Sequence, residues 1–195
     1  MSDQSSLQRA VLLDRDGTIN QEVGYLHKKE EFQFIPRVPE AIRLLKEHGF
    51  LVIVVTNQAG VAKGYYPERA VTELHLYINQ RLAESGAQID AFYYCPHHPA
   101  ADLAQYRMEC NCRKPRPGLL YRAQHDFRID LAASFMIGDN VADVLAGQHA
   151  NCRSILVRTG HGWEQRLDDP SVPIAADLWS AVTDVMGLGR KEPSP

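Results

Sequence analysis

Short apolar runs that end abruptly in polar residues constrain the fold of this chain more than any other feature. Three such runs occur, and the polar residues that follow them are, in chain order, Asp14 with Asp16, Thr56 with Asn57, and Asp139 after Gly138. A continuous apolar run rich in β-branched residues is typical of a parallel strand that is covered on both faces. Because segments with helical spacing separate these runs, the alternation predicts right-handed βαβ units in a three-layer α/β fold with a Rossmann-like parallel sheet.

Hydrophobic periodicity and helix-breaking residues place the other elements. After a first strand at 11–13, we expect strands at 50–56, 89–94, 134–138 and 154–157, and helices at about 39–48, 67–84, 119–127, 141–150 and 178–186. The gaps between the polar motifs leave no room for a large cap or a second domain. We therefore expect one domain over residues 1–195, with a flap at about 20–35, a loop at about 95–114 and a frayed tail at about 189–195.

Composition excludes several classes of partner. The formal net charge of −3 gives no overall attraction to nucleic acid or to anionic membranes. No apolar segment approaches the roughly 20 residues that span a bilayer, and residues 1–8 contain no signal-peptide core. We expect a cytoplasmic monomer without membrane or nucleic-acid partners. The basic run at 113–116 leaves one alternative open, a loop that binds nucleic acid.

The carboxylates of Asp14 and Asp16 allow two interpretations. An Asp-Gly pair after a strand is an ordinary turn, but alternate side chains of an extended segment also share a face and can enter one site. Because the carboxyl ends of parallel strands lie along one edge of a sheet, Asp139 should converge on the same crevice. Three carboxylates this close would repel one another without a cation, and hard oxygen ligands suit Mg²⁺, which takes phosphate oxygens as further ligands. This convergence favours a site for a phosphate substrate over a turn.

The loop at 95–114 concentrates cysteine and histidine and shows little periodicity. A long loop without secondary structure is uncommon unless it binds something, and a metal would supply its missing core. Three thiolates and one imidazole make a closed, structural Zn²⁺ site. The candidate ligands are Cys95, Cys110 and Cys112, with either His97 or His98. Cys152, at the start of an apolar strand, is expected to be a buried small residue.

Four motifs in chain order resemble those of the haloacid dehalogenase superfamily of phosphatases. They are Asp14-x-Asp16-Gly17-Thr18, Thr56, Lys114, and Gly138-Asp139-x-x-x-Asp143. The zinc loop, with Tyr-Tyr-Cys-Pro-His-His-Pro and Cys-Asn-Cys-Arg-Lys-Pro-Arg-Pro-Gly, is similar to that of the branch that contains heptose bisphosphate and histidinol-phosphate phosphatases. This resemblance favours His97 over His98 as the fourth zinc ligand.

The resemblance also implies roles for the catalytic residues. Asp14 would attack phosphorus to form an aspartyl-phosphate, and Asp16 would act as general acid and base. Thr56 would hold phosphoryl oxygens, while Lys114 would offset the negative charge of Asp14 and of the transferring group.

The magnesium ligands implied in the same way are Asp14, Asp139 and the backbone carbonyl of Asp16. Asp143 stands one helical turn beyond Asp139, and two roles for it remain open. It could hold the water shell of the metal or cap the following helix, and Asn140 could play either part.

For the substrate, the resemblance implies a sugar bisphosphate. The expected reaction removes the C7 phosphate of a heptose 1,7-bisphosphate for lipopolysaccharide or another cell-surface glycan, and histidinol phosphate is the second candidate substrate. The residues expected to contact it are Tyr25, His27, Asn57, Gln58 and Arg113. Among them, Arg113 suits bidentate recognition of the phosphate that does not react. Two departures from the expected pattern, Ala59 in place of Ser and Asn140 in place of Lys, leave the chemistry intact but bear on substrate preference.

Overall fold

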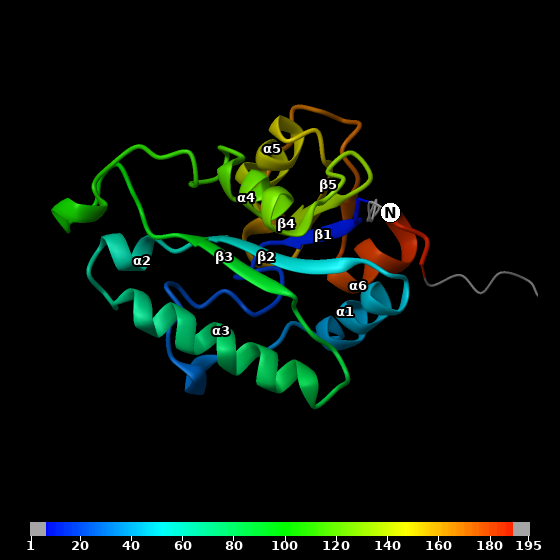
Figure 1. The fold of residues 1–195 in the computed structure, drawn as a ribbon, viewed down its shortest axis with the longest axis horizontal. Coiled ribbons are helices and arrows are strands. Elements are labelled where there is room, and N and C mark those ends of the chain that lie inside the picture. Colours follow the sequence, from blue (N-terminus) through cyan, green and yellow to red (C-terminus); the bar gives the residue numbers. More distant parts are fainter. Residues whose placement is uncertain (1–6, 189–195) are drawn as a thin grey trace, which may run out of the picture.

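The computed structural model describes residues 7–188, and its framework is a six-stranded parallel sheet in the order β3-β2-β1-β4-β5-β6 (Figure 1). The strands are β1 (Ala10–Leu13), β2 (Leu51–Asn57), β3 (Ala91–Cys95), β4 (Phe135–Gly138), β5 (Arg153–Val157) and β6 (Ile174–Ala175). The helices are α1 (Val38–Glu47), α2 (Ala59–Ala62), α3 (Glu68–Ala83), α4 (Gly118–Phe127), α5 (Val141–His149) and α6 (Leu178–Ser180). The frayed tail predicted at 189–195 lies outside the described residues.

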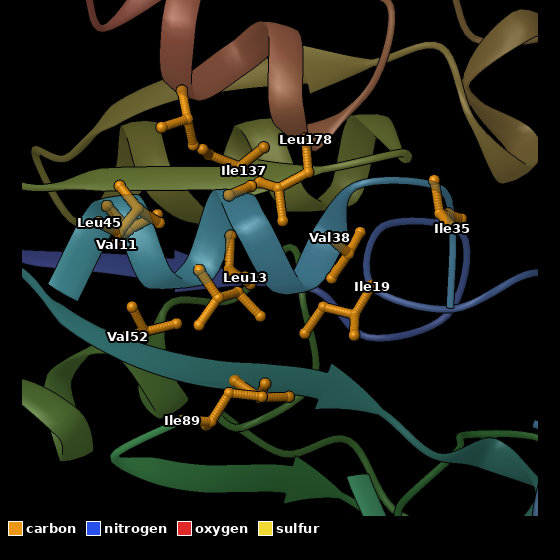
Figure 2. Packing of buried hydrophobic residues seen from close by; sticks show 14 of the residues in the cluster. Val11, Leu13, Ile19, Ile35, Val38, Leu45, Val52, Ile89, Ile137 and Leu178 are labelled. Atoms are coloured by element: carbon orange, nitrogen blue, oxygen red, sulfur yellow. The ribbon is translucent and has the colours of Figure 1, made fainter. Parts of the chain in front are cut away.

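Strand side chains alternate between two apolar clusters, one on each face of the sheet. Val11 and Leu13 of β1 pack with residues of α1, α3 and α6, whereas Leu12 packs with residues of α4 and α5. Figure 2 shows the first cluster, in which Leu45 of α1 and Leu178 of α6 lie over the sheet. Helices therefore cover both faces, as Figure 1 also shows, and the predicted three-layer α/β fold is confirmed.

The sequence signals at the element ends explain most boundaries. Pro39 lies in the first turn of α1, where its missing N–H costs nothing, and Gly49 follows the end of that helix with a φ of 75°. Pro67 occupies the N-cap of α3. The flap folds back on itself as a short hairpin, because Gln21 N–H donates to Gln33 O and Ile35 N–H donates to Ile19 O.

The short elements depart from the prediction. The single turn α2 follows β2, where we expect a loop, and the two-residue strand β6 is not predicted at all. Neither is long enough to produce a periodic pattern. The predicted last helix begins as α6 and continues as one π-helical turn at Ala181–Val185.

Strand order places the polar strand ends together. β1 pairs with β2 on one side and with β4 on the other, so the chain winds in opposite directions from the centre of the sheet. Ligands of open α/β sheets bind at such a switch point, outside the carboxyl ends of the strands. Asp14 follows β1 and Asp139 follows β4, on either side of this crevice.

Within residues 7–188, no helix is both long enough and apolar enough to cross a membrane. The cytoplasmic location and the monomeric state stay predictions.

Candidate active site

A cleft of about 450 Å³ opens at the carboxyl edge of the sheet. Its walls come from the ends of β1, β2 and β4, from the flap, from the zinc loop and from the loop after β5. The predicted site residues that line it are Asp14, Asp16, Tyr25, Thr56, Asn57, Gln58, Arg113, Lys114 and Asp139. His27 is not among its lining residues and faces a neighbouring groove between the flap and α3. The structure thus brings together all the predicted catalytic residues.

Three carboxylates gather at the floor of the cleft. Each of Asp14, Asp139 and Asp143 offers one oxygen, and these oxygens lie within 4.8 Å of one another. Burial, followed by the charge of Asp14, raises the pKa of Asp139 to about 8 from the usual 3.8. A cation among the three groups would remove this repulsion, and an all-oxygen donor set suits Mg²⁺. The residues present therefore fit the predicted magnesium ion.

Gly17 and Gly160 leave room for this acidic cluster. Both have positive φ, 77° and 52° respectively, and a Cβ atom built on either would collide with Oδ2 of Asp139. His161 N–H, next to Gly160, donates to the same oxygen at 2.7 Å. The backbone thus closes around Asp139 and fixes where its carboxylate points.

Lys114 is the cation that faces the acidic cluster. Its Nζ lies 2.8 Å from Asp14 Oδ1 and 2.6 Å from Asp143 Oδ1, and it donates to Val55 O at 2.7 Å. Burial opposes the charge of the ammonium group, but Asp14 and Asp143 outweigh it, so the pKa of Lys114 is raised above 10.5. Lys114 therefore stays charged beside the predicted nucleophile.

Asp143 and Asn140 cap helix α5. Asn140 Oδ1 accepts from Ala142 N–H at 2.9 Å, and Asp143 Oδ2 accepts from Asn140 N–H at 3.0 Å. Because the other oxygen of Asp143 pairs with Lys114, this carboxylate links the helix start to the acidic cluster. The two roles considered for Asp143 are therefore compatible. Asn140 serves as the N-cap of α5.

The end of β2 contributes a hydroxyl and two amide side chains. Gln58 donates from Nε2 to Thr56 Oγ1 at 3.0 Å, which leaves the Thr56 O–H free to donate into the cleft. Asn57 makes two hydrogen bonds with the backbone of Lys114. Oδ1 of Asn57 accepts from Lys114 N–H, and Nδ2 of Asn57 donates to Lys114 O, each at 3.1 Å. Both amides are engaged with protein groups, so their predicted contact with substrate would require these bonds to be exchanged.

Asp16 lines the same cleft but is not part of the acidic cluster, and it pairs with Arg15, whose Nη2 lies 2.8 Å from Asp16 Oδ2. The Arg15 side chain is 0% exposed. His75 of α3 lies beside it, with Nε2 3.5 Å from Arg15 Nη1. Burial, followed by the charge of Arg15, lowers the pKa of His75 to about 3, so this imidazole is neutral.

The flap forms the outer wall of the cleft. Tyr25 has a positive φ of 55°, its ring meets Tyr65 edge to face at 4.9 Å, and Lys63 lies over it. His27, predicted as a second substrate contact, instead stacks on the ring of Tyr66 at 4.6 Å. Of these two predicted flap contacts, only Tyr25 reaches the cleft.

The predicted zinc ligands form one cluster. Ligand atoms of Cys95, His97, Cys110 and Cys112 all lie within 4.8 Å of one another. The Sγ of Cys112 is 3.2 Å from the Sγ atoms of Cys95 and Cys110, and 3.4 Å from Nδ1 of His97. His98 lies outside this group and its Nδ1 accepts from Ala100 N–H. Three sulfurs and one nitrogen in this arrangement fit a tetrahedral Zn²⁺.

Arg113 connects the zinc cluster to the cleft. It follows Cys112 directly, and its Nη1 donates to His97 O at 3.2 Å. Arg113 also lines the cleft, next to Lys114. A metal that orders the loop would therefore also set the positions of both cations.

Several polar residues of the site were not among those predicted. Glu22 and His161 line the cleft, and Arg15 holds Asp16. His161 could have been found by the signal used elsewhere, because it lies in a Gly-containing loop after the apolar strand β5. An arginine between a buried strand and an Asp-Gly pair was a signal for Arg15, since a cation there must have an anionic partner. Nothing in the sequence marked Glu22.

Comparisons with known proteins agree with this geometry. Residues 111–181 match the family described as "HAD-hyrolase-like". The chain is 45% identical over 188 residues to the D-glycero-beta-D-manno-heptose-1,7-bisphosphate 7-phosphatase of Escherichia coli (strain K12), covering 95% of this chain and 96% of the relative. The enzyme of the same name from Yersinia pestis is 46% identical over 152 residues, which cover 77% of this chain and 81% of that one.

A solved structure shares the fold. The D,D-heptose 1.7-bisphosphate phosphatase from B. bronchiseptica, complexed with magnesium and phosphate, superposes with a TM-score of 0.82 at 29% identity. The match covers 92% of this chain and 99% of that chain.

Proposed function

The chain belongs to the haloacid dehalogenase superfamily of phosphatases, as its four motifs predict, and from this premise we propose that it removes the C7 phosphate of D-glycero-β-D-manno-heptose 1,7-bisphosphate. The observation that carries the substrate assignment is the 45% identity over 95% of the chain to a relative named for this reaction. The product would enter the synthesis of cell-surface glycan precursors, as the zinc-loop resemblance implies. A cleft with an acidic floor and cationic walls supports a phosphorylated sugar as substrate.

In the proposed first step, an oxygen of Asp14 attacks phosphorus while the bond between phosphorus and the sugar oxygen breaks. Asp16 gives its proton to that sugar oxygen, which leaves as the free alcohol. Lys114, 2.8 Å from Asp14, offsets the charge that collects on the carboxylate and on the phosphoryl group. The Thr56 hydroxyl donates to a phosphoryl oxygen.

In the proposed second step, Asp16 takes a proton from water, the water oxygen attacks phosphorus, and the bond to Asp14 breaks. Inorganic phosphate is released, and Asp14 and Asp16 return to their starting states. Asp14, Asp139 and the Asp16 carbonyl would hold Mg²⁺, which would supply positive charge to the phosphoryl oxygens when bound. Asp143 would support that site from the first turn of α5.

The walls of the cleft support a second phosphate at one side. Arg113, Glu22 and His161 all line the cleft. Arg113 would form two parallel hydrogen bonds with the C1 phosphate, and Glu22 and His161 would contact the sugar hydroxyls. Histidinol phosphate is the second candidate, because the Glu22 carboxylate would suit its ammonium group. We expect Arg113→Ala to raise KM for the bisphosphate and to leave KM for a monophosphate unchanged.

The experiment that tests the proposed function compares initial rates on heptose 1,7-bisphosphate and histidinol phosphate, with and without Mg²⁺. We expect phosphate release from C7 of the bisphosphate with a higher kcat/KM than phosphate release from histidinol phosphate. Without Mg²⁺ we expect no phosphate release. A higher kcat/KM for histidinol phosphate would overturn the substrate assignment. Equal initial rates with and without Mg²⁺ would overturn the metal assignment.

A further inference from the structure

Arg15 is a buried cation that no motif explains. Taking a guanidinium group out of water is costly unless hydrogen bonds and an anion compensate it. Here both kinds of compensation are present. Nε and Nη2 of Arg15 donate to Asp16, the carbonyl of Leu26 at 3.0 Å and Oε1 of Gln58 at 3.1 Å share the two N–H groups of Nη2 with it, and Nη1 faces His75.

Both oxygens of the Asp16 carboxylate accept hydrogen bonds. Its Oδ1 accepts from Arg15 Nε at 3.1 Å and from Asn20 Nδ2 at 3.0 Å, and its Oδ2 accepts from Arg15 Nη2 at 2.8 Å and from Gln58 Nε2 at 3.0 Å. With donors on both oxygens, its rotamer and the tilt of its plane are fixed. The side chain is nevertheless 18% exposed and lines the cleft.

The same hydrogen bonds reach two other parts of the site. Leu26 belongs to the flap, so Arg15 ties the acid/base residue to the wall that faces the substrate. Gln58 donates to Thr56 as well as to Asp16, and its Oε1 also accepts from the Tyr66 hydroxyl at 3.0 Å. Arg15 and Gln58 thus connect Asp16, the flap and the phosphoryl-binding end of β2.

We propose that Arg15 is a positioning residue, which acts through Asp16 by holding its carboxylate where the proton must be delivered to the leaving sugar oxygen. The proposal rests on the proposed function for the role of Asp16. Proton delivery depends on placement, because a shift of about 1 Å in a reacting group can cost about 100-fold in rate. Arg15 does not touch the substrate in this proposal. Its loss should therefore lower kcat/KM only for substrates whose leaving group needs a proton.

Leaving-group dependence provides the test. An alkyl phosphate expels a poor leaving group that requires protonation, whereas p-nitrophenyl phosphate expels a stable anion that does not. The ratio of kcat/KM values for these substrates is measured for wild type and Arg15→Leu, because kcat/KM reports the steps up to departure of the leaving group. We expect kcat/KM for the alkyl phosphate to fall about 100-fold and that for p-nitrophenyl phosphate to fall less than about tenfold.

Three further variants keep this test decisive. Arg15→Lys retains a cation without the planar fork and should restore part of the ratio even if Arg15→Leu folds poorly. Arg15→Leu added to Asp16→Asn should leave the ratio of the single Asp16→Asn variant unchanged, because both act on one proton transfer. Ser134→Ala, which removes buried hydrogen bonds to Ala10 N–H and Asp130 O at the opposite end of the sheet, should leave the ratio at the wild-type value.

Equal losses on both substrates in Arg15→Leu, or a further change of ratio in the double variant, would overturn the proposal. The alkyl phosphate in these assays is whichever sugar phosphate the wild type hydrolyses fastest. A wrong heptose assignment would therefore appear in the wild-type rates and not in this ratio.

Discussion

Asp14 and Asp16 follow the same strand two residues apart and line the same cleft, but their neighbours differ. Asp14 faces two other carboxylates and receives its cation from Lys114, one hundred positions along the chain. Asp16 receives its cation from its neighbour Arg15 and is held by amide donors from Asn20 and Gln58. One carboxylate sits where a metal and a phosphoryl group would place charge. The other, Asp16, lies at the cleft wall among Arg15, Asn20 and Gln58, which we call the cage of Asp16.

This difference shows how one short motif can carry two chemical roles. The charge beside Asp14 depends on the zinc loop, because Lys114 comes two residues after Cys112 and is held by Asn57. The cage around Asp16 depends on the flap and on α3 through Leu26 and His75. Nucleophile and acid/base are therefore supported by separate parts of the molecule, and each support can be perturbed alone.

The largest expected effect comes from Asp14→Asn, which removes the proposed nucleophile. We expect kcat to fall by about 1,000-fold or more on both an alkyl and an aryl phosphate, because no leaving group can compensate for a missing attacking oxygen. Steady-state phosphate release measures this loss. Asp169→Asn, an exposed loop carboxylate, serves as the control and should keep wild-type rates. Full activity in Asp14→Asn would refute the assigned role.

Lys114→Met should come next, because it leaves the buried Asp143 and the partly buried Asp14 without their cation. Breaking a buried pair in this way costs about 3–5 kcal/mol in the free energy of unfolding, and loss of the charge should lower kcat by about 100-fold. The matched control is Lys46→Met, which breaks a partly exposed pair with Asp90 and should cost about 1 kcal/mol or less. Denaturant unfolding and rate measurements compare the two. Similar losses of stability would contradict the view that burial sets the difference.

Removal of zinc should lower activity less than Lys114→Met does, and it should perturb the surroundings of Asp14 but not those of Asp16. We expect about one Zn²⁺ per chain by metal analysis, and its loss in Cys112→Ser should displace Arg113 and Lys114 while leaving the cage of Asp16 in place. The rates on alkyl and aryl phosphates should then fall by the same factor. A selective loss on the alkyl phosphate would mean that the zinc loop supports Asp16, against the separation described above. Absence of zinc from freshly purified, folded protein would refute the metal itself.

The smallest expected effect concerns His75, at the far side of the Asp16 cage. Its pKa is about 3 in the folded chain against an ordinary 6.5, so between these values the unfolded chain binds a proton that the folded chain does not. The free energy of unfolding should therefore fall as pH drops from 6.5 toward 3, and His75 contributes no pH dependence above this range. His75→Gln keeps a hydrogen-bond acceptor and should decline less steeply in thermal unfolding over the same range. Parallel curves for the two proteins would contradict the depressed pKa.

The sheet and the shared edge could be predicted because they depend on patterns that span several residues. Val52 to Val55 form a β-branched run that is typical of a strand buried on both faces, and polar residues at three strand ends indicate a common crevice. The zinc cluster followed from residue type and resemblance. Strand β6 and helix α2 left no signal, because two and four residues are too few to establish a period.

Side-chain partners were harder to predict than positions. Gln58 was expected to face the substrate, yet its amide lies between Arg15 and Asp16 of the loop after β1, Thr56 of β2, and Tyr66 of the loop before α3. His27 lies in the flap as expected, but stacking on Tyr66 turns it away from the cleft. Such choices depend on tertiary contacts that no local pattern encodes.

The proposed division of labour between Asp14 and Asp16 is tested most directly by locating the phosphoryl group on the enzyme. In Asp16→Asn, p-nitrophenyl phosphate can still phosphorylate Asp14, but water lacks its base, so the aspartyl-phosphate should accumulate. Rapid acid quench followed by mass spectrometry of the peptide that contains residues 10–20 measures this directly. We expect one phosphoryl group on Asp14, together with a burst of p-nitrophenol. Sustained turnover by Asp14→Asn, or undiminished turnover by Asp16→Asn with no phosphoryl group on Asp14, would contradict it.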